Sequence, residues 1–123
     1  MIKEMLIAGA GGFAGTCGRY LVNRLCAAAI PGVFPSGTLA VNLIGCFAAG
    51  LLFGLAEKSE AMSAATAALL VTGFCGGFTT FSTFANDMWK LSDKGDWMTL
   101  ALYLAASVAG GFMLVCAGRA IIR

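Results

Sequence analysis

The chain contains no histidine, and only 11% of its 123 residues are charged. Without an imidazole it lacks the commonest side chain for proton transfer and metal binding near neutral pH. A soluble domain carries roughly 25% charged residues, because its core needs a solvated shell. Hydrophobic residues make up 59% of this chain, and its mean hydropathy is +0.88. These values exclude an ordinary soluble enzyme and indicate a protein that lies within a lipid bilayer.

The few charges and the five cysteines argue against two further classes of protein. Eight basic and six acidic side chains leave a net charge of +2, without the basic surface that nucleic-acid binding requires. The cysteines form no C-x-x-C pair and have no histidine beside them, so we interpret them as small buried apolar residues. They are Cys17, Cys26, Cys46, Cys75 and Cys116.

The spacing of the charges predicts four transmembrane helices, because a charge at the centre of a bilayer is costly. Long uncharged runs separate the charges, and the longest begins with the turn-rich segment 31–37. The remainder of that run, residues 38–56, rises about 28 Å as a helix, close to the hydrocarbon thickness of about 30 Å. We therefore predict an all-α membrane protein with a single domain over residues 1–123. The predicted spans are roughly 4–26, 38–56, 61–86 and 97–118, with short charged connections at 57–60 and 87–96.

The first span extends beyond its uncharged run, which places Arg19 in its last turns, where a long side chain snorkels or faces protein. The same segment also fits a secretory signal peptide. It lacks a small-residue cleavage pattern, however, and three further apolar segments follow it. We therefore expect it to remain in the protein.

Positive charges are divided evenly between the two predicted sides of the membrane. Since an excess of Lys and Arg normally sets orientation, an even count predicts insertion in both directions. Two oppositely inserted copies would then pair as an antiparallel homodimer. One side carries Lys3, Lys58, Arg119 and Arg123, and the other carries Arg19, Arg24, Lys90 and Lys94.

Small and polar residues recur at helical spacing inside the spans. Polar side chains in lipid must find partners or line a wet path. Thr38 and Asn42 share one helix face, as do Tyr103 and Ser107, and each pair fits either role. Three G-x-x-x-G pairs favour close helix packing: Gly11 with Gly15, Gly50 with Gly54, and Gly73 with Gly77.

The third span contains the string GFCGGFTTFSTF at 73–84, which predicts a break at mid-membrane. Its glycines weaken a helix, and its Thr and Ser hydroxyls bond freed backbone groups. Freed carbonyl oxygens suit a cation such as sodium. Phe81 and Phe84 are three residues apart, so their rings stack along one line, and ring edges turned inward favour an anion. The same two rings also fit a lipid-facing or core role.

Taken together, the strings resemble those of the bacterial Fluc/CrcB-type fluoride channels. The resemblance covers nearly the whole chain and is carried by GGFAGTCGRY at 11–20, GTLAVNLIGCFAAG at 37–50 and GFCGGFTTFSTF at 73–84. Tyr103 and Ser107 fall at the usual positions of that family in the fourth span. Asp87 stands where the family often has Glu after the third-span motif.

The resemblance implies a fluoride-selective channel, not an enzyme, in the bacterial inner membrane, where an antiparallel, dual-topology homodimer exports cytoplasmic fluoride by passive electrodiffusion. Its partners would be a second copy, the lipid bilayer and fluoride, with no nucleic acid. The backbone carbonyls of Gly76 and Thr79 would hold a structural sodium ion at the dimer centre, and Arg19 would act as a vestibule or structural residue. The implied fluoride pathway comprises Asn42, Phe81, Phe84, Thr38, Ser82, Thr83, Tyr103 and Ser107.

General chemistry agrees with this expectation. Fluoride is strongly hydrated, so amide and hydroxyl donors must replace its water, while a fixed cation in the path would hold it too tightly. Two rivals remain. A small multidrug or guanidinium exporter has a similar size but uses an acidic residue within its first span, where this chain has none after Glu4. A non-transporting helical assembly factor would need neither Asn42 nor the paired rings.

Overall fold

The computed structural model describes residues 1–59 and 62–123, and every regular element within those ranges is helical. The predicted start of the third span at residue 61, and Glu60 in the preceding connection, lie outside the described residues. The elements are α1 (Ile2–Ala29), α2 (Ser36–Ser59), α3 (Ala64–Ala67), the π-helix η1 (Ala68–Cys75), α4 (Gly76–Phe78), α5 (Ser82–Asp93) and α6 (Trp97–Ile122).

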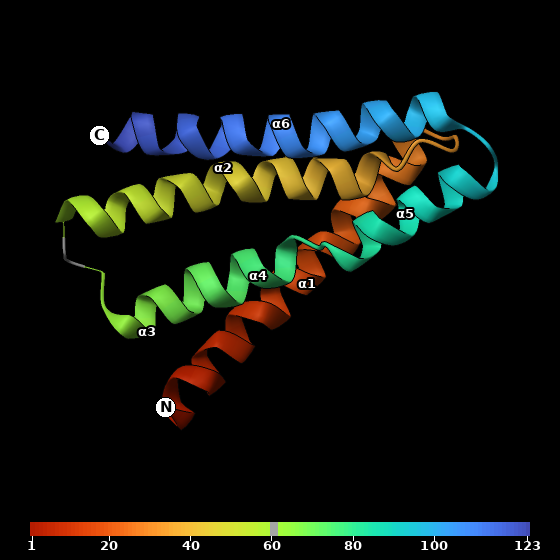
Figure 1. The fold of residues 1–123 in the computed structure, drawn as a ribbon. Helices are drawn as coiled ribbons and strands as arrows, with labels where there is room; N and C mark the ends of the chain where they lie inside the picture. Colours follow the sequence, from red (N-terminus) through yellow and green to blue (C-terminus); the bar gives the residue numbers. More distant parts are fainter. Residues whose placement is uncertain (60–61) are drawn as a thin grey trace.

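The helices form two pairs (Figure 1). Within each pair the chain runs in the same direction, and the two pairs run in opposite directions. In one pair α2 lies along α6, and in the other α1 packs against η1 and α4. Figure 1 shows both termini and the end of α2 at one end of the bundle, whereas the turns after α1 and α5 lie at the other. Each connection therefore returns the chain across the bundle.

Glycines allow the backbones of the two helices in each pair to approach closely. A Cβ on Gly15 of α1 would collide with the Phe74 carbonyl oxygen and lie 2.9 Å from the Phe78 nitrogen. In the other pair, a Cβ on Gly118 of α6 would lie 2.6 Å from the carbonyl oxygen of Phe47. Because these neighbours are backbone atoms, the two helices of each pair approach as closely as small-residue motifs allow.

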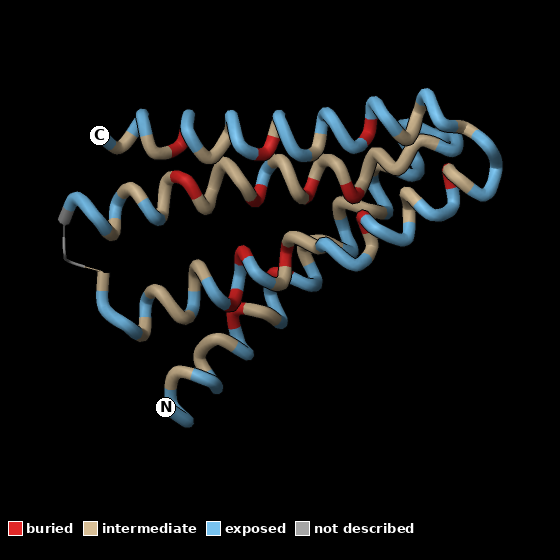
Figure 2. Tube along the Cα trace, in the orientation of Figure 1, coloured by how far each residue is buried: buried red, intermediate tan, exposed pale blue. Residues whose placement is uncertain are grey.

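Few side chains are buried within one copy of the chain (Figure 2). The buried cluster of Phe84, Leu91 and Tyr103 lies between α5 and α6, and partly buried apolar residues surround it. Many large apolar side chains are exposed elsewhere, as in a protein whose outer surface faces lipid or other protein.

Three helical segments are long and apolar enough to cross a membrane: Ser36–Lys58, Ala64–Asp93 and Trp97–Ile122. The helix α1 is not among them, although it has 28 residues. It carries Lys3, Glu4, Arg19 and Arg24, which lower its hydropathy. The sequence prediction of four spans is therefore supported for three of the helical segments.

Three non-helical residues, 79–81, interrupt the third apolar segment. The helix α4 ends at Phe78, Thr79 is extended with φ −87° and ψ 160°, and α5 begins at Ser82. Upstream of this point the chain is wound as a π-helix over eight residues. Wider windings of this kind are frequent near functional sites.

Candidate functional site

An open groove of about 540 Å³ lies between the two helix pairs, beside the interruption at residues 79–81. Its walls come from α2, α6, η1, α4, the interruption at 79–81 and α5. No lining residue that the structure describes carries a formal charge. The lining comprises Asn42, Gly45, Cys46, Ala49, Phe53, Val71, Cys75, Gly76, Thr79, Thr80, Phe81, Phe84, Ser107, Val108 and Val115.

The side chain of Asn42 pairs with the backbone at the interruption. Its Nδ2 donates to the Thr80 carbonyl oxygen at 3.0 Å, and its Oδ1 accepts from the Thr80 N–H at 2.8 Å. One amide thus replaces both partners that a continuous helix would give Thr80. The second hydrogen on Nδ2 remains available as a donor at the groove wall.

The bonds at the interruption free the two carbonyls that the sequence prediction assigned to a cation. In a continuous helix the Thr80 N–H would donate to the Gly76 oxygen, but here it donates to Asn42. Similarly, the Thr83 N–H donates to Thr80 Oγ1 at 3.3 Å and not to the carbonyl oxygen of Thr79. Gly76 and Thr79 both line the groove, so their carbonyls lose helical partners at its wall.

Hydroxyl groups complete the local bonding, as their residue types predicted. Thr79 Oγ1 donates to the carbonyl oxygen of Cys75 at 2.9 Å, and Thr80 Oγ1 donates to Thr83 Oγ1 at 3.2 Å. These bonds stabilise the last turn before the interruption and the first turn after it.

Arg19 supports the interruption from the α1 side. Its Nε donates to the carbonyl oxygen of Gly77 at 3.0 Å, which satisfies an acceptor close to the C-terminal end of α4. The helix α1 continues to Ala29, so Arg19 lies well before its last turn. The helix is therefore longer than the predicted span, and of the two predicted roles the side chain takes the second, because it faces protein.

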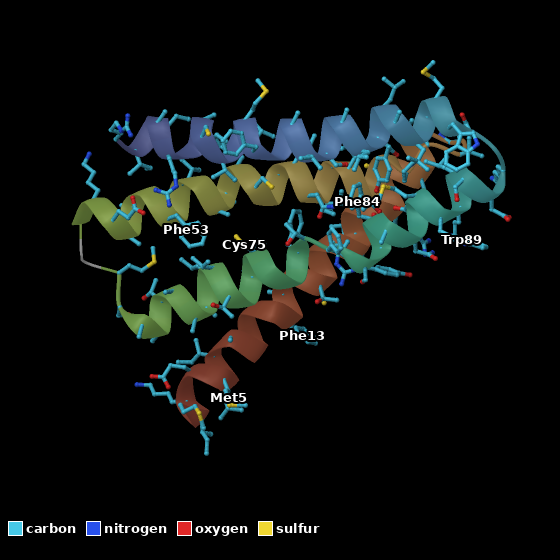
Figure 3. All side chains as sticks on the ribbon, viewed as in Figure 1. Met5, Phe13, Phe53, Cys75, Phe84 and Trp89 are labelled. Atoms are coloured by element: carbon cyan, nitrogen blue, oxygen red, sulfur yellow. The ribbon has the colours of Figure 1, made fainter. Side chains whose placement is uncertain are left out.

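The two phenylalanines differ in burial, although they are neighbours. The Phe81 and Phe84 ring centroids are 5.9 Å apart at an interplanar angle of 54°. Phe81 is 77% exposed, whereas Phe84, which Figure 3 labels, is 5% exposed. The Phe84 ring lies edge-on to that of Tyr103. Both rings line the groove, but only Phe84 is held by the surrounding side chains.

A buried polar contact lies next to the Phe84 ring, on the side of Tyr103. The Tyr103 hydroxyl donates to Asp87 Oδ2 at 3.0 Å, and Tyr103 is fully buried. Thr38 is also buried. On α6, Ser107 Oγ is buried and bonds to none of the described residues. It lines the groove, one helical turn from Tyr103.

The structure thus divides the predicted pathway residues between two places. The groove contains Asn42, Phe81, Phe84 and Ser107, together with the predicted cation ligands. Thr38 and Tyr103 are buried outside the groove lining, whereas Ser82 is exposed at the start of α5 and Thr83 bonds to Thr80. The sequence analysis did not identify Thr80 as the partner of Asn42. The only sequence feature that marks this partner is the pair Thr79-Thr80 in the third-span string.

No metal site built from side chains is present in the described part of the chain. Within residues 1–59 and 62–123, no group of three or more His, Cys, Asp or Glu side chains gathers to hold an ion. The oxygen atoms at the groove wall are main-chain carbonyls and hydroxyls, which suit a hard monovalent cation rather than a transition metal.

Comparison with known proteins gives a consistent result over nearly the whole chain. Residues 6–119 match a family model described as CrcB-like protein, Camphor Resistance (CrcB). A relative from Chlorobium luteolum is 45% identical over 94% of this chain and 88% of its own length. Another, from Rhizobium etli, is 42% identical over 100% of this chain and 98% of its own length. Both relatives are named fluoride-specific ion channel FluC.

Proposed function

Because this chain belongs to the CrcB-like family, we propose that it is a fluoride-specific ion channel of the membrane and not an enzyme. The observation that carries the proposal is the uncharged groove at the interruption of the third apolar segment, where Asn42, Ser107 and two phenyl rings meet. The printed names of its relatives point to the same ion.

The groove supplies the groups that fluoride needs when it loses water. The second Asn42 amide hydrogen and the unpartnered Ser107 hydroxyl are neutral donors at the groove wall. The Phe81 ring is free to turn its positive edge toward an anion because it is exposed. Several neutral sites of this kind bind an ion weakly enough to let it move on. The polar series continues along α5 with Ser82 and Thr83, on α2 with Thr38 and on α6 with Tyr103.

Passive electrodiffusion fits the same lining. Proton-coupled transport needs an ionisable relay inside the membrane, and the groove lining contains no carboxylate and no other formal charge among the described residues. Asp87, the nearest carboxylate to this series, accepts a hydrogen bond from Tyr103 and lies outside the groove lining. Fluoride would therefore flow down its electrochemical gradient, out of the cytoplasm.

An antiparallel homodimer is the assembly that best covers the groove. A phenyl ring as exposed as Phe81 beside an open apolar groove needs a protein partner to become part of a path. Lys3, Lys58, Arg119 and Arg123 lie at one end of the bundle, while Arg24, Lys90 and Lys94 lie at the other. This near balance supports insertion both ways. Reporters fused to the carboxyl terminus should be active on both sides of the membrane, and activity on one side only would contradict the dual topology.

The interruption also fits a structural sodium ion. Gly76 and Thr79 present carbonyl oxygens that have lost helical donors to Asn42 and Thr80. A monovalent hard cation binds such oxygens and offsets their desolvation. In a two-fold assembly the same carbonyls from both copies would surround one ion at the centre. The ion would hold the two interruptions in register.

The fourth span of the proposed single domain is α1. Its 28 residues rise about 42 Å, more than the hydrocarbon thickness requires. Its most deeply placed charge, on Arg19, is bonded to protein and not left in lipid. With α2, the segment from α3 to α5, and α6, the chain would cross the bacterial inner membrane four times.

Fluoride release from liposomes tests this function. Purified protein is reconstituted into vesicles loaded with potassium fluoride, and valinomycin starts efflux, which a fluoride electrode records. We expect rapid release from vesicles with the wild-type protein and none from empty vesicles. Failure to release fluoride, with release of guanidinium or another organic cation instead, would identify an exporter and overturn the proposal.

A further inference from the structure

A second pocket, of about 290 Å³, lies at the end of the pair of α2 and α6 and, among the described residues, shares no lining with the groove. A Cβ on Gly54 would lie 3.3 Å from the Cα of Arg119, so the two helices stay close up to their last turns. Side chains from both helices therefore meet in this pocket. Its described lining comprises Gly54, Glu57, Lys58, Arg119 and Arg123, which supply three cationic side chains and one carboxylate.

Two of the three cations are held in place by neighbouring groups. Arg119 Nη1 lies 2.7 Å from Glu57 Oε2, and the Arg119 Cζ atom lies 5.8 Å from the centroid of the Phe53 ring. Lys58 Nζ donates to the carbonyl oxygen of Ile122 at 3.0 Å. A lysine has three N–H donors and an arginine five, so most of these donors remain available. Donors that are already ordered bind a ligand at a lower entropic cost.

The helix ends account for only part of the positive charge. Both α2 and α6 end at the pocket, and each helix C-terminus is equivalent to about half a negative charge. The two ends and Glu57 together offset about two of the three cationic side chains. Among the described acidic side chains, none forms an ion pair with Lys58 or Arg123. About one positive charge is therefore left to attract an anion.

The pocket lies where two proposed membrane spans end. The apolar segments Ser36–Lys58 and Trp97–Ile122 both finish beside it, which places its charges at the level of the lipid headgroups. Phe53 and Ile121 are exposed within one or two turns of those ends, so apolar surface lies next to the cations. A ligand with one anionic group and attached hydrocarbon chains matches both features.

We propose that this pocket binds the phosphate group of an anionic phospholipid, with Lys58, Arg119 and Arg123 as its donors. Basic pockets between transmembrane helices recognise anionic headgroups in this way. Inorganic phosphate offers similar oxygen atoms but no chains for the apolar surface, and a zwitterionic headgroup brings an ammonium group that the remaining positive charge repels. The inference goes beyond the proposed function, because it does not depend on which ion the groove conducts.

Lipid binding in detergent tests the pocket directly. Purified protein is titrated with phosphatidylglycerol or with phosphatidylcholine of equal chain length, and native mass spectrometry counts the bound lipids. One unit charge about 4 Å away in water changes an affinity about fivefold, so we expect phosphatidylglycerol to bind about fivefold more tightly. Equal binding of the two lipids would overturn the proposal. Excess inorganic phosphate should not displace the lipid, and displacement would identify a soluble anion as the ligand instead.

Substitution of single cations locates the binding. Lys58→Gln and Arg119→Gln should each weaken phosphatidylglycerol binding about fivefold and leave phosphatidylcholine binding unchanged. Lys3→Gln is the matched control, because Lys3 is exposed at the same end of the bundle and is not among the pocket residues (Figure 1). It should bind both lipids as the wild type does. If Lys3→Gln weakened binding as much as Lys58→Gln, the attraction would belong to the whole surface and the pocket would be rejected.

Removal of the carboxylate gives a result of opposite sign. A negative charge about 7 Å from a phosphate group in water weakens its binding about threefold, so Glu57→Gln should tighten phosphatidylglycerol binding by about that factor. If Glu57 served only to hold Arg119 through their ion pair, the same substitution would weaken binding. Weaker or unchanged binding by Glu57→Gln would therefore overturn the proposal. None of these measurements involves fluoride, so an inactive channel would reject the proposed function and leave this result standing.

Discussion

The two helix pairs use the same close packing but differ in continuity. In the pair of α2 and α6 both helices run unbroken, with glycine backbones of each lying against the other. In the other pair, α1 makes the same kind of contact with a segment that is not a continuous α-helix. That segment is wound as the π-helix η1, continues as α4 and then becomes non-helical. Close glycine packing therefore does not break a helix by itself. The interruption occurs where side chains of other helices, Asn42 and Arg19, replace the missing helical bonds.

The largest effect should come from filling the glycine contact in the interrupted pair. Gly15→Ala would drive a Cβ into the carbonyl oxygen of Phe74, which is a backbone atom and not the end of a flexible side chain. We expect a loss of about 1–3 kcal/mol of stability, as for overpacked cores, measured as a lower melting temperature in detergent. Gly12→Ala is the matched control, since its Cβ would meet nothing closer than the Gly73 oxygen at 3.7 Å.

The same substitution in the unbroken pair sharpens the comparison. Gly118→Ala would place a Cβ 2.6 Å from the Phe47 oxygen, so it should cost as much as Gly15→Ala. If Gly15→Ala behaved like Gly12→Ala while Gly118→Ala was damaging, the interrupted pair would be loosely packed. The two pairs would then not share one packing principle.

Removal of the amide that bridges the interruption should have the next largest effect. Asn42→Ala leaves the N–H and carbonyl of Thr80 without their partners, and because both groups are only part-buried the loss of stability should be about 1 kcal/mol, below that of Gly15→Ala. We expect fluoride efflux to fall about tenfold or more, because 1.4 kcal/mol added to a barrier corresponds to a factor of ten. Asn42→Asp keeps an acceptor for the Thr80 N–H but places a carboxylate in the groove. It should fold and conduct no fluoride, whereas wild-type efflux from Asn42→Ala would reduce Asn42 to a packing contact.

Much of the fold could be predicted from the sequence, because charges and apolar runs have large transfer energies in lipid. The all-helical architecture and the three apolar segments follow from that physics. Whether α1 crosses the membrane could not be predicted in the same way. The charge of Arg19 argues against a span, whereas its hydrogen bond to the Gly77 carbonyl oxygen lowers the cost of placing that charge there. That bond joins residues 58 positions apart, and no local pattern encodes it.

The candidate site was predictable in residue type but not in bonding. The polar side chains and the glycine pair in the third-span string indicate a polar region at mid-membrane. The pairing of Asn42 with Thr80 depends on the register of α2 against the third segment, which the spacing of either helix leaves open. The π-helix was also unpredicted, because apolar periodicity does not distinguish 3.6 residues per turn from a wider winding.

The two phenylalanines beside the interruption are expected to separate conduction from stability. Phe81→Ile and Phe84→Ile both remove a ring edge from the groove, so both should slow fluoride efflux. Only Phe84 is packed against Tyr103, so only Phe84→Ile should lower stability, by about 1 kcal/mol. Melting temperatures and efflux rates measured on the same preparations distinguish the two effects. Unchanged efflux from Phe81→Ile would reject a role for its ring in the path.

The smallest effect is expected at the charged end of the unbroken pair. Arg119 Nη1 lies 2.7 Å from Glu57 Oε2, a shorter contact than either bond made by Asn42. Both side chains are solvent-accessible, however, so water and salt compensate for the loss of the pair. Glu57→Gln should therefore leave melting temperature and efflux unchanged within error. A loss comparable to that of Asn42→Ala would mean that a second copy or a lipid headgroup buries this end, and that burial, not the interruption, determines which polar contacts matter.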